Sequence, residues 1–265
     1  MRDLLERLLR NEISIDQVER LLQINEMAEI QDAALDLSRE FRAGVPEVVL
    51  GEGKTSAHVV DIVLTFLASK GRAIVTRASE EQISAVSEAI PEGCDLWVND
   101  KARLIVAQKQ GVEIHKIGRK VGIMTGGTSD ILVAEEARVV AEEMGCDVIT
   151  AYDVGIAGFH RHIKPLKRMI EEGVDAIVVI AGMEGALPSV VSSLVDVPVI
   201  GVPTSVGYGF GAQGIGALTT MLQTCSPGLC VVNIDNGVGA GAYAALIARG
   251  VARALREASG AEGQK

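Results

Sequence analysis

The 265-residue chain can form one large domain or two smaller ones, and its 48% hydrophobic content is sufficient for a buried core. Only 3% of the residues are aromatic, so Val, Ile, Leu and Ala must build that core, as in parallel sheets covered on both faces. The net charge of −10 argues against a general nucleic-acid or membrane-surface binder. The N-terminus shows no basic-apolar-small signal, and no apolar run is long enough to span a bilayer, which predicts a soluble, cytoplasmic protein.

The first 43 residues carry apolar side chains at the spacing typical of amphipathic helices. Ser14 and Gln17 stand three positions apart, as in the capping box that begins a helix. The apolar residues between Ala33 and Leu37 continue this periodicity, so we expect a further helix there.

Residues 46–118 predict a small α/β unit, in which Val- and Ile-rich runs alternate with helical segments. The expected strands are Pro46–Leu50, Arg72–Thr76, Leu96–Val98 and Arg103–Val106, and the expected helices are Ser56–Ser69 and a segment capped by Ser79 and Gln82 that runs through Ala89. The Ile114–Lys120 stretch looks like a connection, so we place the first domain at residues 1–118.

The second half contains five apolar runs, each leading into a polar, glycine-rich loop. The runs are Val121–Met124, Val148–Thr150, Ala176–Ile180, Pro198–Val202 and Cys230–Val232. Alternation with helix-length segments indicates an α/β fold with a doubly wound parallel sheet. Ligands bind at the carboxyl ends of such strands, so the loops should form one active-site edge. We expect this domain at residues 119–258, closed by a helix at Gly241–Ala258, with residues 259–265 as a frayed tail.

The segment Gly126–Asp130 lies at an expected strand-to-helix turn. Glycines let backbone N–H groups approach a ligand and the helix N-terminus is positive, so Gly127, Thr128 and Ser129 suit a phosphate. The alternative is a tight turn capped by Ser129 or Asp130. An acidic Asp130 beside an anion would instead orient a hydroxyl group or handle a proton.

Charged side chains follow the next two expected strands. His160 and His162, flanked by Arg161 and Lys164, could be metal ligands, a general acid/base, an anion clamp, or incidental members of a surface loop. No carboxylate or thiol of ligand spacing stands nearby, so we expect no metal site. Glu184 follows an entirely apolar strand, where it could act in catalysis or complement the N-terminus of the next helix.

A glycine-rich loop and two cysteines complete the candidates. The loop with Gly207, Gly209 and Gly211 has too many glycines for a simple connection, so it should lie against a ligand or move as a lid. Cys225 ends an expected helix, a position that raises a thiol pKa, so residue physics alone makes it structural. Cys230, on an expected buried strand, is also predicted to be structural.

The second half resembles the PurE-type aminoimidazole ribonucleotide carboxylases. The matching segments are Gly127–Asp130, Gly158–Arg161, Ile180–Pro188, Pro198–Val202 and Gly214–Met221. The resemblance implies a flavodoxin-like three-layer sandwich and a homo-octamer, and the small residues of Gly237–Ala245 suit packing at a subunit interface. Two features depart from that family: its Ser-Ala-His-Arg is Gly-Phe-His-Arg at Gly158–Arg161, and a full N-terminal domain precedes.

The chain from about residue 30 to residue 250 is similar to the LarB family, which begins nickel-pincer cofactor synthesis. The matching segments are Arg42–Val49, Gly51–Thr55, Thr76–Ser79, Thr125–Asp130, Cys225–Gly228 and Asn233–Gly241. The resemblance implies carboxylation of the pyridinium ring of nicotinic acid adenine dinucleotide and hydrolysis of its phosphoanhydride, which gives pyridinium-3,5-biscarboxylic acid mononucleotide and AMP. It implies CO₂ or bicarbonate as co-substrate, no tightly bound cofactor, and a Mg²⁺ ion that could accompany the substrate diphosphate.

The same resemblance implies roles for individual residues. Cys225 is the nucleophile that adds to the ring. The candidates for proton transfer and ring orientation are Asp130, His160 and Glu184. The groups expected at phosphate or carboxylate are Arg161, Lys164 and the Gly207–Gly211 loop. The groups expected to close over the nucleotide from the first domain are Arg42, Lys54 and Arg77.

Two other functions compete with this interpretation. One is an aminoimidazole ribonucleotide carboxylase or mutase of purine synthesis, which the extra domain and the Cys-Ser-Pro-Gly context of Cys225 disfavour. The other is a non-catalytic nucleotide-binding module. Convergence of Asp130, His160, Glu184 and Cys225 on one sheet edge would disfavour binding alone.

Overall fold

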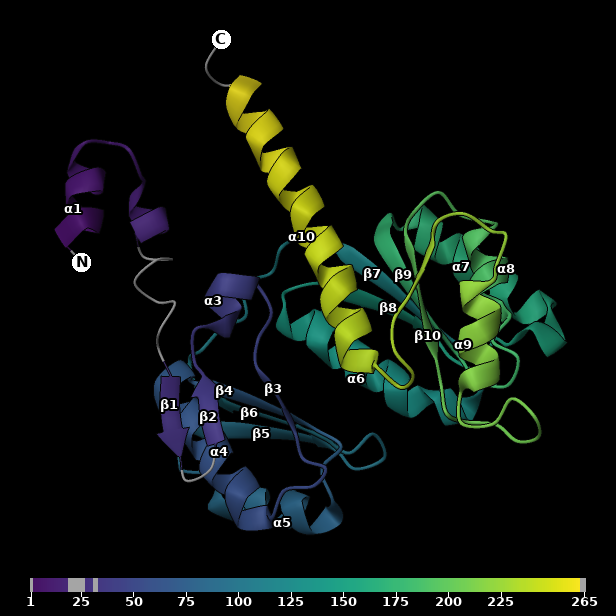
Figure 1. Cartoon of the computed structure of the whole chain (residues 1–265), viewed down its shortest axis with the longest axis horizontal. Coiled ribbons are helices and arrows are strands. Elements are labelled where there is room, and N and C mark those ends of the chain that lie inside the picture. The colour runs from purple at the N-terminus through teal and green to yellow at the C-terminus, as the bar shows by residue number, and fades with distance from the viewer. Residues whose placement is uncertain (1, 19–26, 31–32, 263–265) are drawn as a thin grey trace. The chain divides into compact units, whose positions relative to one another are not determined.

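The computed structural model describes all residues except 1, 19–26, 31–32 and 263–265. The chain divides into two compact units, Met1–Val112 and Glu113–Lys265, which are considered separately (Figure 1). The division falls before the Ile114–Lys120 connection, whereas the sequence placed it after residue 118.

The first unit is an α/β unit with helical and strand elements in mixed order. Its elements are α1 (Arg2–Leu9), β1 (Met27–Ile30), β2 (Ala33–Asp36), α3 (Arg39–Ala43), β3 (Val48–Leu50), α4 (Ser56–Lys70), β4 (Arg72–Thr76), α5 (Glu80–Ala89), β5 (Cys94–Asn99) and β6 (Leu104–Lys109). Strands β3, β4, β6 and β5 form one sheet in that order, with β3 and β4 parallel and the other pairs antiparallel.

Helix caps in this unit follow the sequence signals. The Gln17 backbone N–H donates to Ser14 Oγ (3.2 Å), and the Ser14 N–H donates to Gln17 Oε1 (2.8 Å), which confirms the expected capping box. Ser79 and Gln82 make the same reciprocal pair at the start of α5. Each box satisfies backbone donors that a helix N-terminus leaves unpaired.

The helix expected over Ala33–Leu37 is wrong. Residues Ala33–Asp36 form β2, which pairs antiparallel with β1 from Met27↔Asp36 to Ile30↔Ala33. Leu35 is buried in the apolar core of this unit. Strand pairing and burial therefore override the local helix preference of Ala and Leu.

The second unit is a three-layer sandwich. Its elements are β7 (Lys120–Thr125), the 3₁₀ turn η1 (Thr128–Asp130), α6 (Ile131–Glu143), β8 (Asp147–Ala151), the 3₁₀ turn η2 (Ile156–Gly158), α7 (His160–Glu171), β9 (Val174–Ala181), α8 (Leu187–Ser192), β10 (Val199–Pro203), α9 (Ile215–Leu222), β11 (Leu229–Val231) and α10 (Gly237–Glu262). The sheet order is β11-β10-β9-β7-β8 and every pair is parallel. Numbered along the chain, this is the flavodoxin-like order 2-1-3-4-5, which confirms the expected fold.

Helices cover both faces of this sheet. Figure 1 shows α6 and α10 on one face and α7, α8 and α9 on the other. All eight residues of β9 and all five of β10 are buried, as strands covered on both sides require. The low aromatic content fits this arrangement, because small and branched side chains such as Val, Ile and Ala fill both faces of the sheet.

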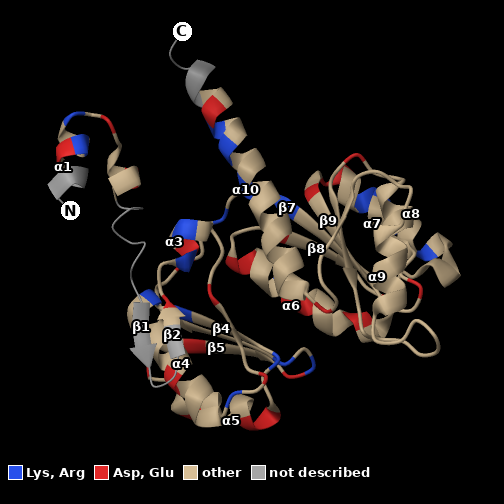
Figure 2. Ribbon diagram, in the orientation of Figure 1, with Lys and Arg blue, Asp and Glu red and all other residues tan. Residues whose placement is uncertain are grey.

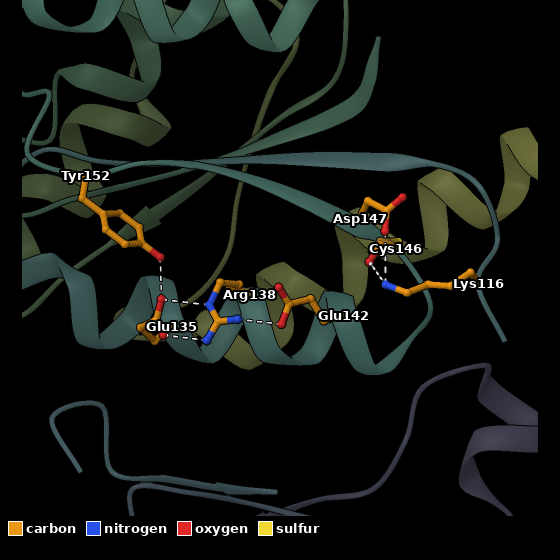
Figure 3. A network of polar contacts seen from close by, with 7 residues as sticks. All are labelled: Lys116, Glu135, Arg138, Glu142, Cys146, Asp147 and Tyr152. Carbon is orange, nitrogen blue, oxygen red and sulfur yellow. Dashed lines mark hydrogen bonds and ion pairs between the residues drawn. The ribbon is translucent and has the colours of Figure 1, made fainter. Parts of the chain in front are cut away.

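Polar contacts attach β8 to α6 (Figure 3). Glu135 accepts two hydrogen bonds from Arg138, at 3.0 and 2.8 Å, and one from the Tyr152 hydroxyl at 2.5 Å, beyond the end of β8. Burial and the Glu135 carboxylate raise the pKa of Tyr152. At the other end, burial raises the pKa of the Cys146 thiol to about 11, so this cysteine is inert packing.

Helix α10 is longer than the sequence indicated. It runs to Glu262, so most of the expected frayed tail is helical. By length and composition alone, the segment Gly237–Ser259 is long and apolar enough to cross a membrane. This differs from the expectation that no apolar run of the chain could span a bilayer. In this α/β fold, 39% of its apolar 18-residue stretch is buried.

The small residues of α10 pack inside the unit. A Cβ added at Gly237 would lie 2.2 Å from Val133 O, and one added at Gly241 would lie 2.3 Å from Ala137 O, both on α6. Glycine is required because the two helix backbones approach this closely. Gly237 and Gly241, which belong to the segment expected at a subunit interface, therefore serve the contact between α10 and α6.

Candidate functional site

The carboxyl ends of β7, β9 and β10 are joined by backbone hydrogen bonds. The Gly126 N–H donates to Ile180 O (2.8 Å), and the Thr204 N–H donates to Ala181 O (3.1 Å). The strand order reverses between β7 and β9, and doubly wound sheets bind ligands in the crevice at that point. The glycine-rich loops after these strands therefore meet where a ligand site is expected.

A cavity of about 250 Å³ opens at this position. The residues that line it are Gly126, Gly127, Ser129, Asp130, Gly155, Ile156, Ala157, Arg161, Ala181, Gly182, Met183, Glu184, Ala186, Leu187 and Val206. They come from the carboxyl end of β9 and from the turns, loops and helix starts that follow β7, β8, β9 and β10. Five of the expected site residues thus come together: Gly127, Ser129, Asp130, Arg161 and Glu184.

Asp130 is the buried acid of this cavity, with only 4% of its surface exposed. Its Oδ2 accepts from the Gly127 N–H (2.8 Å), and its Oδ1 accepts from Thr204 Oγ1 (2.7 Å). Burial raises the pKa of the Asp130 carboxyl, these hydrogen bonds oppose the rise, and the Asp235 carboxylate adds to it. An acid with a raised pKa beside a cavity suits proton transfer.

Arg161 and Glu184 bring exposed charges of opposite sign to the cavity. Arg161 Nη1 donates to Asp153 Oδ2 (3.1 Å), which holds the guanidinium beside the loop after β8. A Cβ at Gly158 would lie 2.4 Å from Arg161 Nε, so only glycine leaves room for this conformation. The cavity can therefore contact both an anionic and a hydrogen-bond-donating part of a ligand.

His160 and His162 do not form a pair. Both lie on α7 rather than in a loop, and side chains two positions apart on a helix point in different directions. His160 and Lys164 are exposed and lie outside the cavity lining. His162 is buried against Phe159, with ring centroids 4.6 Å apart, and burial lowers its pKa, which favours the neutral imidazole.

The glycine-rich loop after β10 borders the cavity at one point. Val206 lines the cavity, and its carbonyl accepts from the Met183 N–H (3.2 Å). Gly207 and Gly209 adopt positive φ angles of 149° and 76°, which explains glycine at both positions. Gly207, Gly209 and Gly211 themselves lie outside the cavity lining, as does the exposed Thr128.

Cys225 lies at the opposite, amino-terminal edge of the sheet. Helix α9 starts at the carboxyl edge of the sheet. The residue before it, Gly214, lies so close to the end of β10 that an added Cβ would be 3.0 Å from Thr204 O. The helix then runs back along the sheet, and Cys225 follows it. Three residues later, Gly228 O accepts from the Val199 N–H (3.0 Å) at the first residue of β10.

This position contradicts one expectation from the sequence. From Val199 to Pro203, β10 covers about 13 Å, so the thiol of Cys225 is separated from the Asp130 cavity by the strand length. Convergence of Cys225 with Asp130, His160 and Glu184 is therefore wrong for a single copy of the chain. The physical reason is that every right-handed crossover returns the chain to the amino edge before the next strand. Cys225 is exposed there, and Cys230 is exposed on β11, which pairs only with β10 at the sheet edge.

The first-unit candidates lie in two places. Lys54 and Arg77 belong to the loops after the paired strands β3 and β4. Arg77 Nη1 lies 3.9 Å from Glu52 Oε2 in the first of these loops. Gln82 Nε2 on α5 holds that same loop by donating to Gly51 O (2.9 Å) and Lys54 O (2.7 Å). Arg42 lies on α3, where it pairs with Asp36. Lys54 and Arg77 are thus neighbours, and Arg42 belongs to a separate ion pair.

Sequence reasoning missed three polar residues behind the cavity. Thr125 is buried, and its Oγ1 accepts from the Asp153 N–H (2.9 Å), which ties the loop after β8 to β7. Thr204 is buried and bonds Asp130, while Asp235 Oδ1 accepts from the Ser205 N–H (2.8 Å). A threonine directly after an apolar strand and before a glycine-rich loop was the available signal.

Comparison with known proteins agrees with this organisation. Residues 27–110 match the LarB/PurE-like N-terminal domain, and residues 120–262 match AIR carboxylase. An uncharacterised protein of Methanocaldococcus jannaschii is 50% identical over 254 residues, covering 94% of this chain and 97% of that protein.

Two further relatives match about half of this chain. The N5-carboxyaminoimidazole ribonucleotide mutase of Thermotoga maritima is 33% identical, over 48% of this chain and 74% of that protein. A probable mutase of the same kind from Methanothermobacter thermautotrophicus is 34% identical, over 48% of this chain and 37% of that protein. The chain therefore belongs to the AIR carboxylase family, and its LarB/PurE-like N-terminal domain gives it the two-domain organisation of LarB.

Proposed function

We propose that the protein carboxylates the pyridinium ring of nicotinic acid adenine dinucleotide and hydrolyses its phosphoanhydride to give pyridinium-3,5-biscarboxylic acid mononucleotide and AMP. The observation that carries the proposal is a LarB-type N-terminal domain preceding a PurE-like domain in one chain. The family membership supports a carboxylase or mutase type of enzyme, and the Cys-Ser-Pro-Gly segment at Cys225 supports the pyridinium substrate.

The proposed reaction needs a nucleophile because a pyridinium ring is electron-poor and cannot attack CO₂. The Cys225 thiolate adds to a ring carbon, and the new C–S bond turns the cation into a neutral dihydropyridine with a nucleophilic enamine carbon. That carbon forms a bond to CO₂, a base removes its proton, and the thiolate leaves to restore aromaticity. No net oxidation occurs, since one C–H bond and CO₂ become a carboxylate and a proton.

The cavity supplies the other proposed roles. Asp130 is the base for ring deprotonation because it is buried and its pKa is raised. Glu184 orients the ring or transfers a proton, and Arg161 binds a carboxylate or phosphate. His160 and Lys164 remain proposed contacts from the exposed start of α7, beyond the cavity lining.

Two glycine-rich segments and the first unit complete the proposed substrate contacts. Backbone N–H groups of the η1 turn, which includes Thr128 and Ser129, would bind phosphate. Lys54 and Arg77, and more weakly Arg42 with its Asp36 partner, would contact the nucleotide from the first unit.

The position of Cys225 supports a multi-chain enzyme. Within one copy the thiol lies at the amino edge of the sheet and the cavity lies at the carboxyl edge. A thiol that attacks a ring held at Asp130 must therefore come from a second copy. We propose a homo-octamer, by resemblance to PurE-type enzymes, in which each copy provides Cys225 to the cavity of a neighbour.

The remaining components follow from the substrate. Among the described residues, no cluster of three or more His, Cys, Asp or Glu side chains could hold a metal ion. From the chemistry of the substrate we propose that its diphosphate holds Mg²⁺ and that CO₂ or bicarbonate enters from solution. We also propose that the enzyme works in the cytoplasm without a tightly bound cofactor.

The second candidate function is an N5-carboxyaminoimidazole ribonucleotide mutase or a related carboxylase. The similarity of the second unit to curated mutases favours it. The mutase relatives match about half of this chain, and the LarB/PurE-like N-terminal domain at residues 27–110 disfavours this candidate. A non-catalytic nucleotide-binding module remains the third possibility.

Mass spectrometry after incubation with nicotinic acid adenine dinucleotide and ¹³C-bicarbonate tests the proposal. We expect pyridinium-3,5-biscarboxylic acid mononucleotide in which one of the two carboxylates carries the label, with a stoichiometric release of AMP. Parallel incubation with carboxylated and uncarboxylated aminoimidazole ribonucleotide provides the control. Turnover of the imidazole alone would establish the second candidate, and tight dinucleotide binding without turnover would establish the third.

A further inference from the structure

The segment from Val206 to Gly211, which we call the aromatic loop, exposes two rings to solvent. Tyr208 is 80% exposed and Phe210 is 109% exposed, in a chain with only four Phe and three Tyr. Scattered exposed apolar residues need no explanation, but two exposed rings at alternate positions of one short loop do.

The loop is held in place at both ends. At its start, Val206 O accepts from the Met183 N–H (3.2 Å), and a Cβ at Gly182 would lie 2.3 Å from the same oxygen. At its end, Gly211 O accepts from the Gly216 N–H (3.2 Å), and a Cβ at Gly211 would lie 3.1 Å from Gly216 Cα. The two rings are thus presented by an anchored loop rather than by a free tail.

The loop adjoins the Asp130 cavity. Val206 and Met183 both line the cavity, and a Cβ at Gly207 would lie 3.4 Å from Met183 Sδ. The rings therefore follow the cavity rim by two and four residues along the chain. A ligand that extends from the cavity past Met183 comes to the loop that carries them.

The cavity is too small for a whole dinucleotide. Its volume of about 250 Å³ is below the roughly 300–1,000 Å³ of pockets that enclose a drug-sized ligand. A dinucleotide bound there extends beyond the cavity. The segment from Thr204 to Gly214 contains no charged residue, and Figure 2 shows the connection between β10 and α9 without Lys, Arg, Asp or Glu. It suits a flat, neutral ring better than a phosphate.

We propose that Tyr208 and Phe210 form a purine clamp that stacks on the adenine ring of the substrate while the pyridinium end occupies the cavity. The inference rests on the proposed dinucleotide substrate and adds an adenosine subsite to it. Stacking on aromatic side chains suits a purine because every base presents a π-face. Gly207 and Gly209 give the loop the backbone conformation in which the two rings stand free.

Kinetics with Tyr208→Leu and Phe210→Leu test the clamp. Leucine keeps apolar bulk but loses the flat ring. We expect each change to raise the KM for nicotinic acid adenine dinucleotide about tenfold with little change in kcat. The inhibition constant of nicotinic acid mononucleotide, which lacks the adenosine half, should stay within about twofold. Tyr243→Leu is the matched control, because Tyr243 is a 51% exposed ring on α10, and it should alter neither constant.

Direct binding separates failure of the clamp from failure of the proposed function. Calorimetry with AMP alone should show affinity that Phe210→Leu weakens about tenfold, even if the wild-type protein proves inactive on the dinucleotide. Equal losses of affinity for the dinucleotide and the mononucleotide, or no loss of affinity for either, would overturn the clamp. A change in oligomer mass in both loop variants by mass photometry, with AMP binding unchanged, would also overturn it and assign the rings to a contact between copies.

Discussion

At the residue scale, the chemistry of the cavity depends on how Asp130 is enclosed. The carboxyl group is buried, and donors from two different loops occupy its oxygens, the Gly127 N–H and the Thr204 hydroxyl. This combination fixes the orientation of the acid while leaving its pKa raised. The sequence identified Asp130 from its place after a strand, but its partner 74 positions later becomes visible only when the sheet brings β7 and β10 to one edge.

Asp130→Asn should abolish carboxylation without unfolding the protein. General acid–base groups contribute about 10²–10⁴-fold to rates, so we expect a loss of at least about 100-fold in kcat. The amide still accepts one hydrogen bond, which limits the stability cost to about 1 kcal/mol.

Glu184→Gln should lower kcat with no change in melting temperature, because Glu184 is exposed. Full activity in both variants would remove these carboxylates from the mechanism.

Thr204→Val should shift the pH dependence of the enzyme. The Thr204 hydroxyl stabilises the ionised carboxylate, so its hydrogen bond lowers the pKa of Asp130. Loss of the bond raises that pKa further, and the acid limb of the kcat/KM profile should move to higher pH if ionised Asp130 is the base. Thr219→Val is the control, since its hydroxyl bonds Ile215 O on exposed α9. A limb that stays in place, or moves to lower pH, contradicts this role.

Cys225→Ser should abolish both carboxylation and the absorbance of a dihydropyridine adduct in the nucleotide complex. A serine hydroxyl is far less acidic than a thiol, so little nucleophile exists at neutral pH. Phosphoanhydride hydrolysis needs no thiol and should survive. Cys230→Ser is the control, and because Cys230 is exposed rather than buried as first expected, it should cost little stability. Wild-type carboxylation by Cys225→Ser would return this cysteine to a structural role.

At the element scale, α10 illustrates how packing selects residue size along one helix. Gly237 and Gly241 lie directly against carbonyl groups of α6, whereas Gly250 has open space around it. These three glycines of one helix therefore have different surroundings. Close contact explains the first two, and nothing in the structure explains the third.

Gly241→Ala and Gly250→Ala should have opposite effects on stability. A methyl group at Gly241 would lie 2.3 Å from Ala137 O, so we expect a loss of about 1–3 kcal/mol in the free energy of unfolding. At Gly250 alanine should add up to about 1 kcal/mol, because it is the better helix former. Thermal or urea unfolding measures both changes. Equal effects at the two positions would show that helix propensity, not the contact with α6, decides.

Most elements of the fold could be predicted from local sequence. Arg72–Thr76 was expected with the bounds that β4 has, and the cap of α5 was expected from Ser79 and Gln82. The strand pair β1–β2 was missed because its residues favour helix and only pairing makes them extended. The loop expected around His160 and His162 was wrong, because both residues lie in the first turn of α7.

At the scale of the whole molecule, each copy of the proposed enzyme is incomplete. Several cavity residues could be predicted from the sequence, because the loops that follow parallel strands all lie at the carboxyl edge of the sheet. Cys225 was expected at the carboxyl edge because the family resemblance implied a catalytic role, whereas its place after α9 puts it at the amino edge. Family resemblance indicates which groups react, and topology decides which chain supplies them.

Mixing inactive variants should restore activity. Cys225→Ser keeps an intact cavity, and Asp130→Asn keeps an intact thiol. If the thiol comes from a second copy, reassembly of equal amounts after mild dissociation should recover roughly a quarter of wild-type carboxylation, the fraction of sites with both groups intact. Assay of each variant treated alone is the control. Activity that stays at background after confirmed subunit exchange would mean that thiol and acid act within one chain.

The separation of Cys225 from the Asp130 cavity by the length of the sheet also bears on how such an enzyme can arise. Substitutions at the amino edge are expected to leave the buried hydrogen bonds of the carboxyl edge undisturbed, since the length of the strands separates the two edges. An ancestor that already brought these edges together in its assembly could gain a covalent catalyst by a single change to cysteine. The new reaction would then depend on a substitution in the neighbouring copy of the chain, while the residues of the ancestral pocket stay unchanged.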